Sequence, residues 1–373
     1  IPFSSIFLFL FYSFEVRVSS FIILHHTKGV YDDEVYLEFG DFLFSWSGNP
    51  QTSIDIFRFQ LKNGWLNQHI FKVTPNESVI YKEIFFYVMK WLKPNFTDIA
   101  TNKQTTGLGH VTISDLKRLS VVIPDMELQR KIGDFLHSVD RKIALNTAIN
   151  ENLEQQAQAI FKAWFVDFEP FGGVMPNDWT ETTLGTIAAI STKSINPLKQ
   201  PDLYLEHYSI PAYDEQHYPV FEYASEVKSN KYILTNNSVM ISKLNPDTKR
   251  IWRPLCLSAN PVCSTEFIVY EAVNPIYKDY IYSLIDSQAF SDYLCAHTTG
   301  STNSRQRATP KTTLDYTCIM PSDDTITRFC GIVTPMYDQI ASNIIESQRL
   351  AALRDTLLPK LMNGEIDVSA VKS

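Results

Sequence analysis

A pattern that occurs twice, 197 residues apart, constrains this chain of 373 residues more strongly than any other feature. In each copy, apolar side chains recur at spacings of three and four over many turns. The stripe of the first copy consists of Ile132, Leu136, Val139, Ile143, Asn146, Asn150, Leu153, Ala157, Ile160 and Trp164, and that of the second consists of Phe329, Val333, Met336, Ile340, Asn343, Ser347, Leu350, Arg354, Leu357 and Leu361. This spacing predicts two long helices with one buried stripe each, and two helices related by a repeat most simply pack against each other.

Two prolines mark where these helices begin. Pro124 and Pro321 obey the same offset of 197, and Pro124 cannot continue a helix backwards. Asp125 is expected to cap the first helix. The predicted helices cover residues 125–165 and 323–363, which is about 40 residues and roughly 60 Å each at ~1.5 Å per residue.

A globular segment precedes each predicted helix, so the chain is expected to alternate between globular and helical parts. If the helices were parallel, the chain would have to travel back roughly 60 Å between them, so antiparallel packing is expected. The predicted fold class is α+β, with two globular α/β-mixed domains separated by a long antiparallel two-helix coiled coil and related by a pseudo-twofold repeat. The predicted segments are residues 1–122 (first domain), 123–168 (first spacer helix), 169–178 (linker), 179–320 (second domain), 321–366 (second spacer helix) and 367–373 (tail).

Asn146 and Asn343 occupy equivalent positions in the two apolar stripes. A buried polar pair would fix the register of the two helices at some cost in stability. A solvated position on a loosely packed seam is the alternative.

Within the globular segments, short apolar runs broken by Gly, Asn and Pro predict strands. The first segment is expected to contain strands at 35–39, 42–46 and 54–59, a helix at 83–92 and a loop at 105–110. The second is expected to contain strands at 239–242 and 265–270, a helical stretch at 276–294 and a loop at 299–300. The two loops are 193 residues apart instead of 197, which predicts a four-residue slip between the loop and the long helix.

The apolar segment 1–24 is interrupted by Glu15 and Arg17. Its uncharged part is shorter than the ~20 residues that span a membrane. We expect it to form buried strands of a first domain that is atypical or incomplete at its N-terminal side. A membrane or processing role and an artefactual N-terminus are the alternatives.

The five cysteines all lie in the second half of the chain, and none forms a C-x-x-C pair. An odd number without metal-ligand spacing argues against a disulfide framework or a zinc site. Buried free thiols in the cytoplasm are therefore expected, and no metal is expected in this chain.

No catalytic motif is found. Each Asn-Pro pair lacks the second proline of an adenine-methyltransferase loop, and there is no Gly-rich phosphate loop, H-E-x-x-H or nucleophile elbow. Pro124-Asp125 with Asp140-Arg141-Lys142 resembles a nuclease metal motif. However, two carboxylates fifteen residues apart on one helix would lie about 22 Å apart and could not share an ion.

The net charge of −8 has the wrong sign for a whole-protein grip on nucleic acid, so any DNA contact would rest on local basic clusters or be shared with a basic partner. Three such clusters contain cations, the first of them around Asn245, and cations with amides can hold phosphates and contact base edges. They consist of Lys243, Lys249, Arg250 and Arg253; of Asn303, Arg305, Gln306, Arg307 and Lys311; and of Lys103, Gln104 and His110 in the first segment. A solvated surface is the plainer interpretation of any single cluster.

Four segments together resemble a known family, the DNA-specificity subunits of type I restriction-modification systems. They are Trp179 to Gly185, Thr106 to Gln129, Leu153 to Pro170 (ending FKAWFVDFEP), and Leu353 to Ile366 (LRDTLLPKLMNGEI). The first domain departs from the family pattern because it lacks an opening Trp…Leu-Gly segment.

The resemblance implies a non-catalytic cytoplasmic subunit. Its two target recognition domains would each contact one half of a bipartite DNA site, and its helices would set the gap and dock methyltransferase subunits. A restriction-translocase subunit would join the complex. S-adenosylmethionine, ATP and Mg²⁺ would act in the partners, with no cofactor in this chain. A coiled-coil scaffold, an inactive or truncated specificity subunit and a single-chain nuclease are the alternatives.

Overall fold

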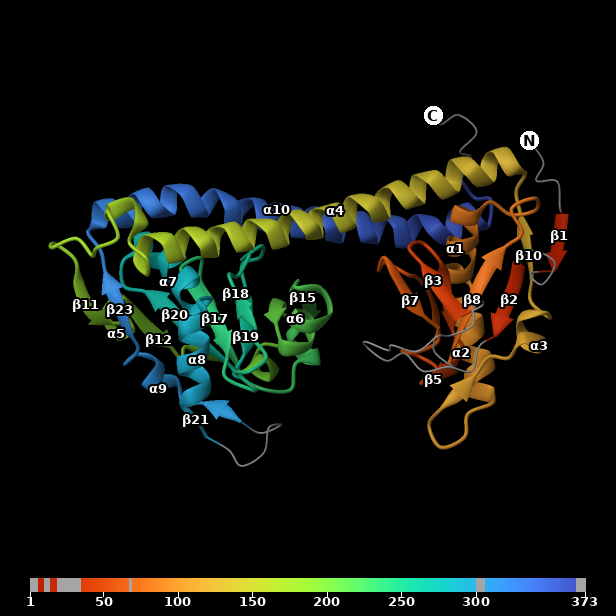
Figure 1. The fold of residues 1–373 in the computed structure, drawn as a ribbon. Helices are drawn as coiled ribbons and strands as arrows, with labels where there is room; N and C mark the ends of the chain where they lie inside the picture. The colour runs from red at the N-terminus through yellow and green to blue at the C-terminus, as the bar shows by residue number, and fades with distance from the viewer. Residues whose placement is uncertain (1–5, 10–13, 19–34, 67–68, 300–305, 367–373) are drawn as a thin grey trace. The chain divides into compact units, whose positions relative to one another are not determined.

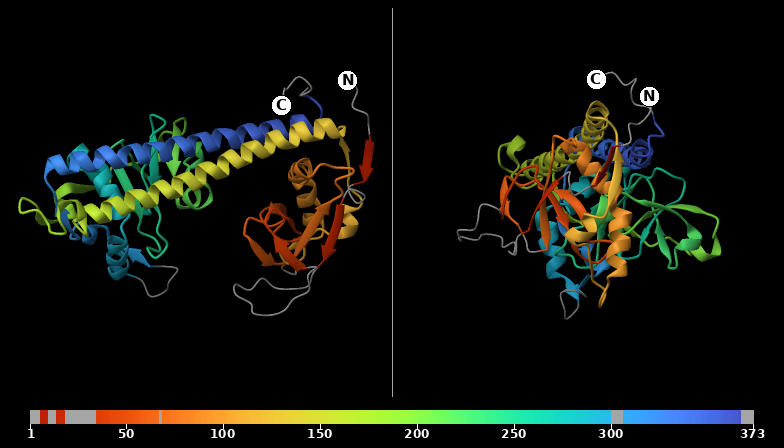
Figure 2. Two further views of the ribbon diagram at one scale, coloured as in Figure 1. Left: turned by 45° about the horizontal axis from the view of Figure 1, so that its top comes forward. Right: turned by 90° about the vertical axis from the view of Figure 1, so that its right-hand side faces the viewer.

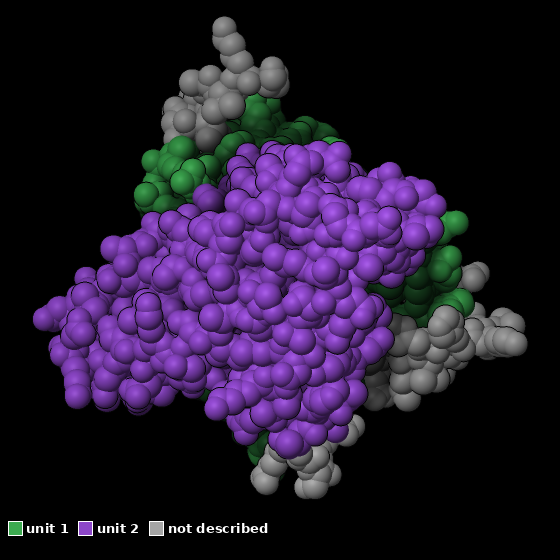
Figure 3. All heavy atoms as spheres, turned by 90° about the vertical axis from the view of Figure 1, so that its left-hand side faces the viewer, with its two compact units in different colours: residues 1–143, 349–373 green, residues 144–348 purple. Residues whose placement is uncertain are grey.

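The computed structural model describes residues 6–9, 14–18, 35–66, 69–299 and 306–366, and the chain divides into two compact units (Figures 1 and 3). Unit 1 comprises residues 1–143 and 349–373, and unit 2 comprises residues 144–348. Both contain strands and short helices, so the predicted α+β class is confirmed.

Two helices of 40 residues each, α4 (Met126–Phe165) and α10 (Asp323–Met362), contribute segments to both units. Their ends lie 197 residues apart, as the sequence repeat predicts. Asp125 accepts a hydrogen bond from the backbone N–H of Leu128 at 3.0 Å, which confirms it as the N-terminal cap of α4.

Within each unit, the α4 and α10 segments lie side by side and run antiparallel (Figure 2). In unit 2, Asn146 contacts Ser347, whereas Phe165 lies against Phe329 with ring centroids 4.9 Å apart. Residues further along α4 thus contact residues nearer the start of α10, as in an antiparallel pair. In unit 1, Asp140 pairs with Arg354, and Leu136 shares a core with Leu361.

Unit 1 packs its strands and short helices against the start of α4 and the end of α10. Its elements are β1 (Ile6–Phe9), β2 (Phe14–Val18), β3 (Tyr36–Glu38), β4 (Phe42–Ser45), β5 (Ser47–Gly48), β6 (Asp55–Arg58), β7 (Asn63–Trp65), β8 (Ile70–Pro75), α1 (Lys82–Trp91), α2 (Lys93–Asn102), β9 (Gly109–His110), α3 (Ile113–Leu116) and β10 (Ser120–Ile123). The predicted strands and the first predicted helix are confirmed.

Among the described residues, unit 2 contains more strands and short helices than unit 1. They are η3 (Glu169–Phe171), β11 (Thr180–Thr183), α5 (Leu184–Ile187), β12 (Ala188–Ser191), β13 (Ser194–Ile195), η4 (Pro197–Lys199), β14 (Tyr204–Tyr208), α6 (Ile210–Gln216), β15 (Val220–Tyr223), η5 (Ala224–Glu226), β16 (Lys231–Ile233), β17 (Ser238–Ser242), β18 (Ile251–Trp252), β19 (Pro261–Ser264), β20 (Phe267–Ala272), η6 (Pro275–Tyr277), α7 (Lys278–Ile285), α8 (Gln288–Ala296), β21 (Thr298–Thr299), β22 (Arg307–Ala308), α9 (Pro310–Thr313) and β23 (Thr317–Met320).

The repeat extends from the long helices into both sheets. The strand order β2-β8-β4-β6 of unit 1 corresponds to β12-β20-β17-β18 of unit 2. Strand β1 pairs antiparallel with β10, as β11 pairs with β23. The segment 1–24 therefore supplies strands, as expected, whereas the burial of its side chains lies outside the described residues.

The offset between the units is 174 residues at the first two matched strands, where β1 begins at Ile6 and β11 at Thr180, and β2 begins at Phe14 and β12 at Ala188. It is close to 197 from β4 and β17 onward, with a small slip after α2 and α8. The ends of α2 and α8 are 194 residues apart, whereas α3 and α9 return to 197. The slip falls in the intervening loop, close to where the sequence placed it, although Gly300 itself lies outside the described residues.

The predicted helical stretch 276–294 is confirmed, with one break, because Ser287 accepts a hydrogen bond from the backbone N–H of Phe290 and so begins a new helix, α8. One local prediction was wrong. The segment 105–110 is not entirely a loop, since β9 pairs with β5. A Cβ atom at Gly109 would lie 2.3 Å from the carbonyl oxygen of Ala100, so only glycine permits this approach to α2.

The Asn146 and Asn343 side chains are buried, 0% and 4% exposed, which excludes the solvated alternative. Asn146 donates to Ser347 Oγ at 3.2 Å and to Glu346 Oε2 at 2.9 Å. Asn343 donates to Asn150 Oδ1 at 2.8 Å. The two positions form one polar layer inside an otherwise apolar seam.

All five cysteines are free, as predicted, but they are not all buried. Cys263 and Cys318 are buried, whereas Cys295 is exposed near the end of α8. Burial raises the pKa of the Cys318 thiol to about 12. Among the described residues, no helix is long and apolar enough to cross a membrane.

Candidate nucleic-acid interface

A small hairpin in unit 2 brings two of the predicted basic clusters together. Strands β21 and β22 pair antiparallel at the end of the unit remote from its long helices (Figure 1). The carbonyl of Lys243 accepts a hydrogen bond from Ala308 N–H at 2.9 Å, and the carbonyl of Gln306 accepts one from Asn245 N–H at 3.0 Å. The segment after β17 therefore lies along β22. The sequence could not reveal this contact, because the two segments are some sixty residues apart.

The side chains on this surface combine cations with amides. Arg307 is 51% exposed and pairs with Glu266, with its Nε 3.1 Å from Oε2. Lys311 is exposed in the first turn of α9, and Gln306 is half-buried. Lys243 is half-buried and has no ion-pair partner within the described part of the chain. Asn303 and Arg305 lie outside the described residues.

The remaining cations of the first cluster are each paired with an acid of unit 2. Lys249 pairs with Asp286. Arg250 donates to both carboxylate oxygens of Asp214, at 2.6 and 2.9 Å. The sequence showed only Asp247 near these cations, because their partners lie on distant elements. Their role in DNA binding stays a prediction, and the contacts observed are intramolecular.

Of the three paired cations Lys249, Arg250 and Arg253, Arg253 pairs with two acids. Its Nε lies 2.7 Å from Asp279 Oδ1, and its Nη2 lies 3.0 Å from Asp338 Oδ1 on α10. The side chain is 16% exposed. This geometry ties the globular part of unit 2 to its long helix and leaves Arg253 poorly placed to contact a phosphate.

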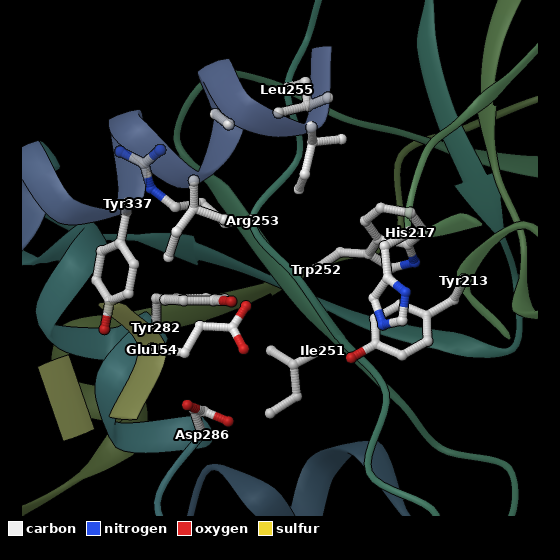
Figure 4. Close-up of a pocket in the computed structure, with 13 residues that line it drawn as sticks. Glu154, Tyr213, His217, Ile251, Trp252, Arg253, Leu255, Tyr282, Asp286 and Tyr337 are labelled. Carbon is white, nitrogen blue, oxygen red and sulfur yellow. The ribbon is translucent and has the colours of Figure 1, made fainter. Parts of the chain in front are cut away.

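A pocket of about 120 Å³ lies between this part of unit 2 and its long helices (Figure 4). Figure 4 shows the Glu154 carboxylate pointing into it, opposite Tyr213 and His217. Burial, together with the negative charges of Asp286 and Glu151, raises the pKa of Glu154 to about 7. Two acids and several aromatic side chains line the pocket, and its arginine, Arg253, is already paired with Asp279, which suits a phosphate poorly.

In unit 1, the predicted residues surround the turn between α2 and β9. Lys103 donates to Asp115 Oδ1 at 2.6 Å, and Thr112 with Asp115 forms a capping box for α3. Although burial acts in the opposite direction, the hydrogen bonds from Lys103 and Thr112 lower the pKa of Asp115. Gln104 is exposed and His110 is half-buried in β9. As in unit 2, this surface lies remote from the long helices (Figure 1).

The predicted spacer residues form the seam between α4 and α10 within each unit. Every one is buried or half-buried: Leu136, Val139, Ile143, Asn146, Leu153, Ile160, Val333, Met336, Ile340, Asn343, Leu350 and Leu357.

The nuclease-like motif has no metal-binding geometry. Asp140 accepts hydrogen bonds from Tyr87 and Arg354, both at 2.5 Å, while Asp125 caps the start of the same helix. In the described part of the chain, no three His, Cys, Asp or Glu residues are close enough together to hold a metal ion.

Comparison with known proteins gives a consistent result. Residues 11–155 match the model of the type I restriction modification DNA specificity domain. The chain is 26% identical to the type I restriction enzyme HindI specificity subunit of Haemophilus influenzae, over 79% of each chain. It is 25% identical to the MjaIX specificity subunit of Methanocaldococcus jannaschii, covering 81% of this chain and 73% of that protein. The fold is similar to a type I restriction-modification S subunit from M. genitalium, with a TM-score of 0.58, 15% identity and 97% of both chains covered.

Proposed function

The chain belongs to the family of type I restriction-modification DNA-specificity subunits, and on this premise we propose that it recognises a bipartite DNA site without catalysing a reaction itself. Each unit would contact one half-site through the surface remote from its long helices. In unit 2 this surface contains Lys243, Gln306, Arg307 and Lys311, and in unit 1 it contains Gln104 and His110.

The observation that carries this proposal is the repeat of a whole unit. Two α+β units share one strand order and are built on helices of equal length. Each presents polar and basic residues at the equivalent loop. Two units with the same scaffold suit a bipartite site, because different loops on that scaffold can select different bases in each half-site.

The chemistry would come from partner subunits in the cytoplasm. Methyltransferase subunits would dock on α4 and α10 and use S-adenosylmethionine, while a restriction-translocase subunit would use ATP and Mg²⁺. Basic partners would also supply much of the phosphate contact, since this chain carries a net charge of −8.

A comparison of host DNA methylation with and without this gene tests the proposal. We expect one asymmetric bipartite motif to lose its methylation when the gene is deleted. Replacing residues 179–319 by those of another family member should change one half of the motif only. If deletion leaves the methylation pattern unchanged, the chain acts as a scaffold or as an inactive copy instead.

A further inference from the structure

In each unit, one buried acid joins the first helix of the globular part to a long helix. In unit 1 this acid is Glu83, near the start of α1. Its Oε2 accepts a hydrogen bond from Arg58 Nη2 at 2.5 Å, and His137 Nδ1 on α4 lies 3.5 Å from the same oxygen. The Arg58 guanidinium also lies over the Phe42 and Phe86 rings, 5.0 and 4.4 Å from their centroids.

In unit 2 the corresponding acid is Asp279, near the start of α7. It accepts hydrogen bonds from Arg253 Nε at 2.7 Å and from Arg253 Nη2 at 3.2 Å. Thr334 on α10 donates to Asp279 Oδ2 at 2.6 Å. The carboxylate is therefore held by a globular arginine on one side and by a long-helix side chain on the other. In unit 1 the arginine also donates to the acid, whereas the long-helix side chain, His137, lies beside it without a hydrogen bond.

These junctions occupy equivalent positions of the repeat. His137 and Thr334 are 197 residues apart, and Glu83 and Asp279 are 196 apart, like the first residues of α1 and α7. The residue types differ at both positions, yet the contact is kept.

A second matched contact lies one helical turn further along. In unit 1 the Tyr87 hydroxyl donates to Asp140 Oδ2 at 2.5 Å. In unit 2 the hydroxyls of Ser283 and Tyr337 are 2.8 Å apart. The tyrosine is on the short helix α1 in unit 1 and on the long helix α10 in unit 2. In both units a polar contact joins the short helix to the long one.

Stability alone is a poor reason to keep such contacts, because burying a charged pair costs desolvation that apolar packing would avoid. These contacts are directional. Two helices packed only through apolar side chains can slide or rotate slightly against each other, whereas hydrogen bonds to one carboxylate fix their relative orientation.

We propose that Glu83 and Asp279 are positioning residues, which fix the direction of each globular part on its long helix and so determine how strictly a complex discriminates the gap between half-sites. This rests on the proposed DNA recognition. It adds that the helix pair alone does not set the gap, because the junction of each unit with its helix also contributes.

The test uses the full chain assembled with its methyltransferase subunits and a series of duplexes carrying the native motif with its gap unchanged, lengthened or shortened by one base pair. Asp279→Asn keeps the side-chain shape but removes the charge that holds Arg253. We expect its preference for the native gap to fall about fivefold or more, while binding to the native duplex changes less. Asp279→Glu, which installs the acid used in unit 1, should retain most of the preference. Asp324→Asn changes an exposed acid on α10, the helix that contributes Thr334, and should behave as the unchanged chain does.

Equal loss of affinity for all three gaps would overturn the proposal, because a merely structural residue weakens every complex alike. If Asp279→Asn does not fold, Thr334→Val removes only the helix contact and is measured in the same way. Hydrogen exchange without DNA provides a second readout. Faster exchange across α7, with α8 unaffected, is expected for either variant, and unchanged exchange in α7 overturns the positioning role. If the unchanged complex shows no gap preference, DNA recognition fails instead, and the exchange result still decides the role of the junction.

Discussion

Asn146 of α4 and Asn343 of α10 lie at equivalent positions of the repeat and meet in the same buried layer of unit 2. The Asn146 amide donates toward the Asn343 carbonyl at 3.4 Å and also bonds Glu346 and Ser347. Asn343 in turn receives a hydrogen bond from Gln339 at 2.7 Å and donates to Asn150. Because several partners satisfy each amide, the layer favours one register of the helices over its neighbours.

Asn146→Ala should destabilise the protein, because it leaves buried polar partners without their donor. We expect a loss of about 1–3 kcal/mol in the free energy of unfolding. Urea unfolding followed by circular dichroism measures this loss. Replacing the exposed residue Asn152 by alanine in the same helix is the control and should change stability by less than about 0.5 kcal/mol. A similar effect at both positions would mean that the buried layer contributes nothing specific.

The long helices could be predicted from the sequence because their signal is local and repeated. Spacings of three and four over about nine turns, with a proline before each run, gave both boundaries to within a residue or two. The strand order could not be predicted, since the pairing of β8 with both β2 and β4 joins segments far apart in the chain.

The candidate DNA interface could be predicted only in part from the sequence. The sequence identified Lys243 and Arg307 as members of two separate basic clusters. Only the fold shows that the backbone segments carrying them lie side by side. Composition also grouped Arg253 with them, although Asp279 and Asp338 hold it at the junction with α10. Extending the repeat from the helices into the globular parts would have pointed to Glu83 and Asp279.

Replacing Arg307 or Lys243 by alanine should weaken DNA binding by the assembled complex. If either residue contacts a base edge, the loss should be about 1–3 kcal/mol and confined to one half-site; a phosphate contact should instead reduce the salt dependence by about one charge. Binding measured at several salt concentrations separates the two. Arg328→Ala, on the long helix, is the control and should leave the affinity of the unit 2 surface intact. Unchanged binding by both variants would remove β22 and its neighbour from the interface.

The protein should lose stability as the pH rises from about 4.5 to about 7, because Glu154 must ionise in the folded state where it is desolvated and faces the charges of Asp286 and Glu151. Its pKa is raised to about 7 from an ordinary value of 4.5, so the folded state binds the extra proton across this window and the penalty is complete above it. Lys249 opposes the effect, and the neighbouring Tyr213 hydroxyl stays protonated because burial raises its pKa to about 12.

Glu154→Gln should flatten this pH dependence and raise the melting temperature at pH 8 more than at pH 5. Thermal unfolding at a series of pH values is the measurement. Glu127→Gln, at an exposed position in the same helix, is the control and should leave the profile unchanged. An identical pH profile for the Glu154 variant and the unchanged chain would show that this carboxylate ionises normally.

Replacing either of two helical glycines by alanine should change the free energy of unfolding, in opposite directions. A Cβ at Gly133 in α4 would lie 2.8 Å from the backbone nitrogen of Ile84 and 3.1 Å from Glu83 Cβ, whereas nothing lies within 4 Å of a Cβ at Gly331 in α10. Gly133→Ala should therefore push α1 away from α4 and cost about 1–3 kcal/mol. Gly331→Ala should gain up to about 1 kcal/mol from helix propensity alone. Urea unfolding of the two variants gives both values. If Gly133→Ala were as stable as Gly331→Ala, the close approach of α1 to α4 would be incorrect, and the Glu83 contact with His137 would be lost with it.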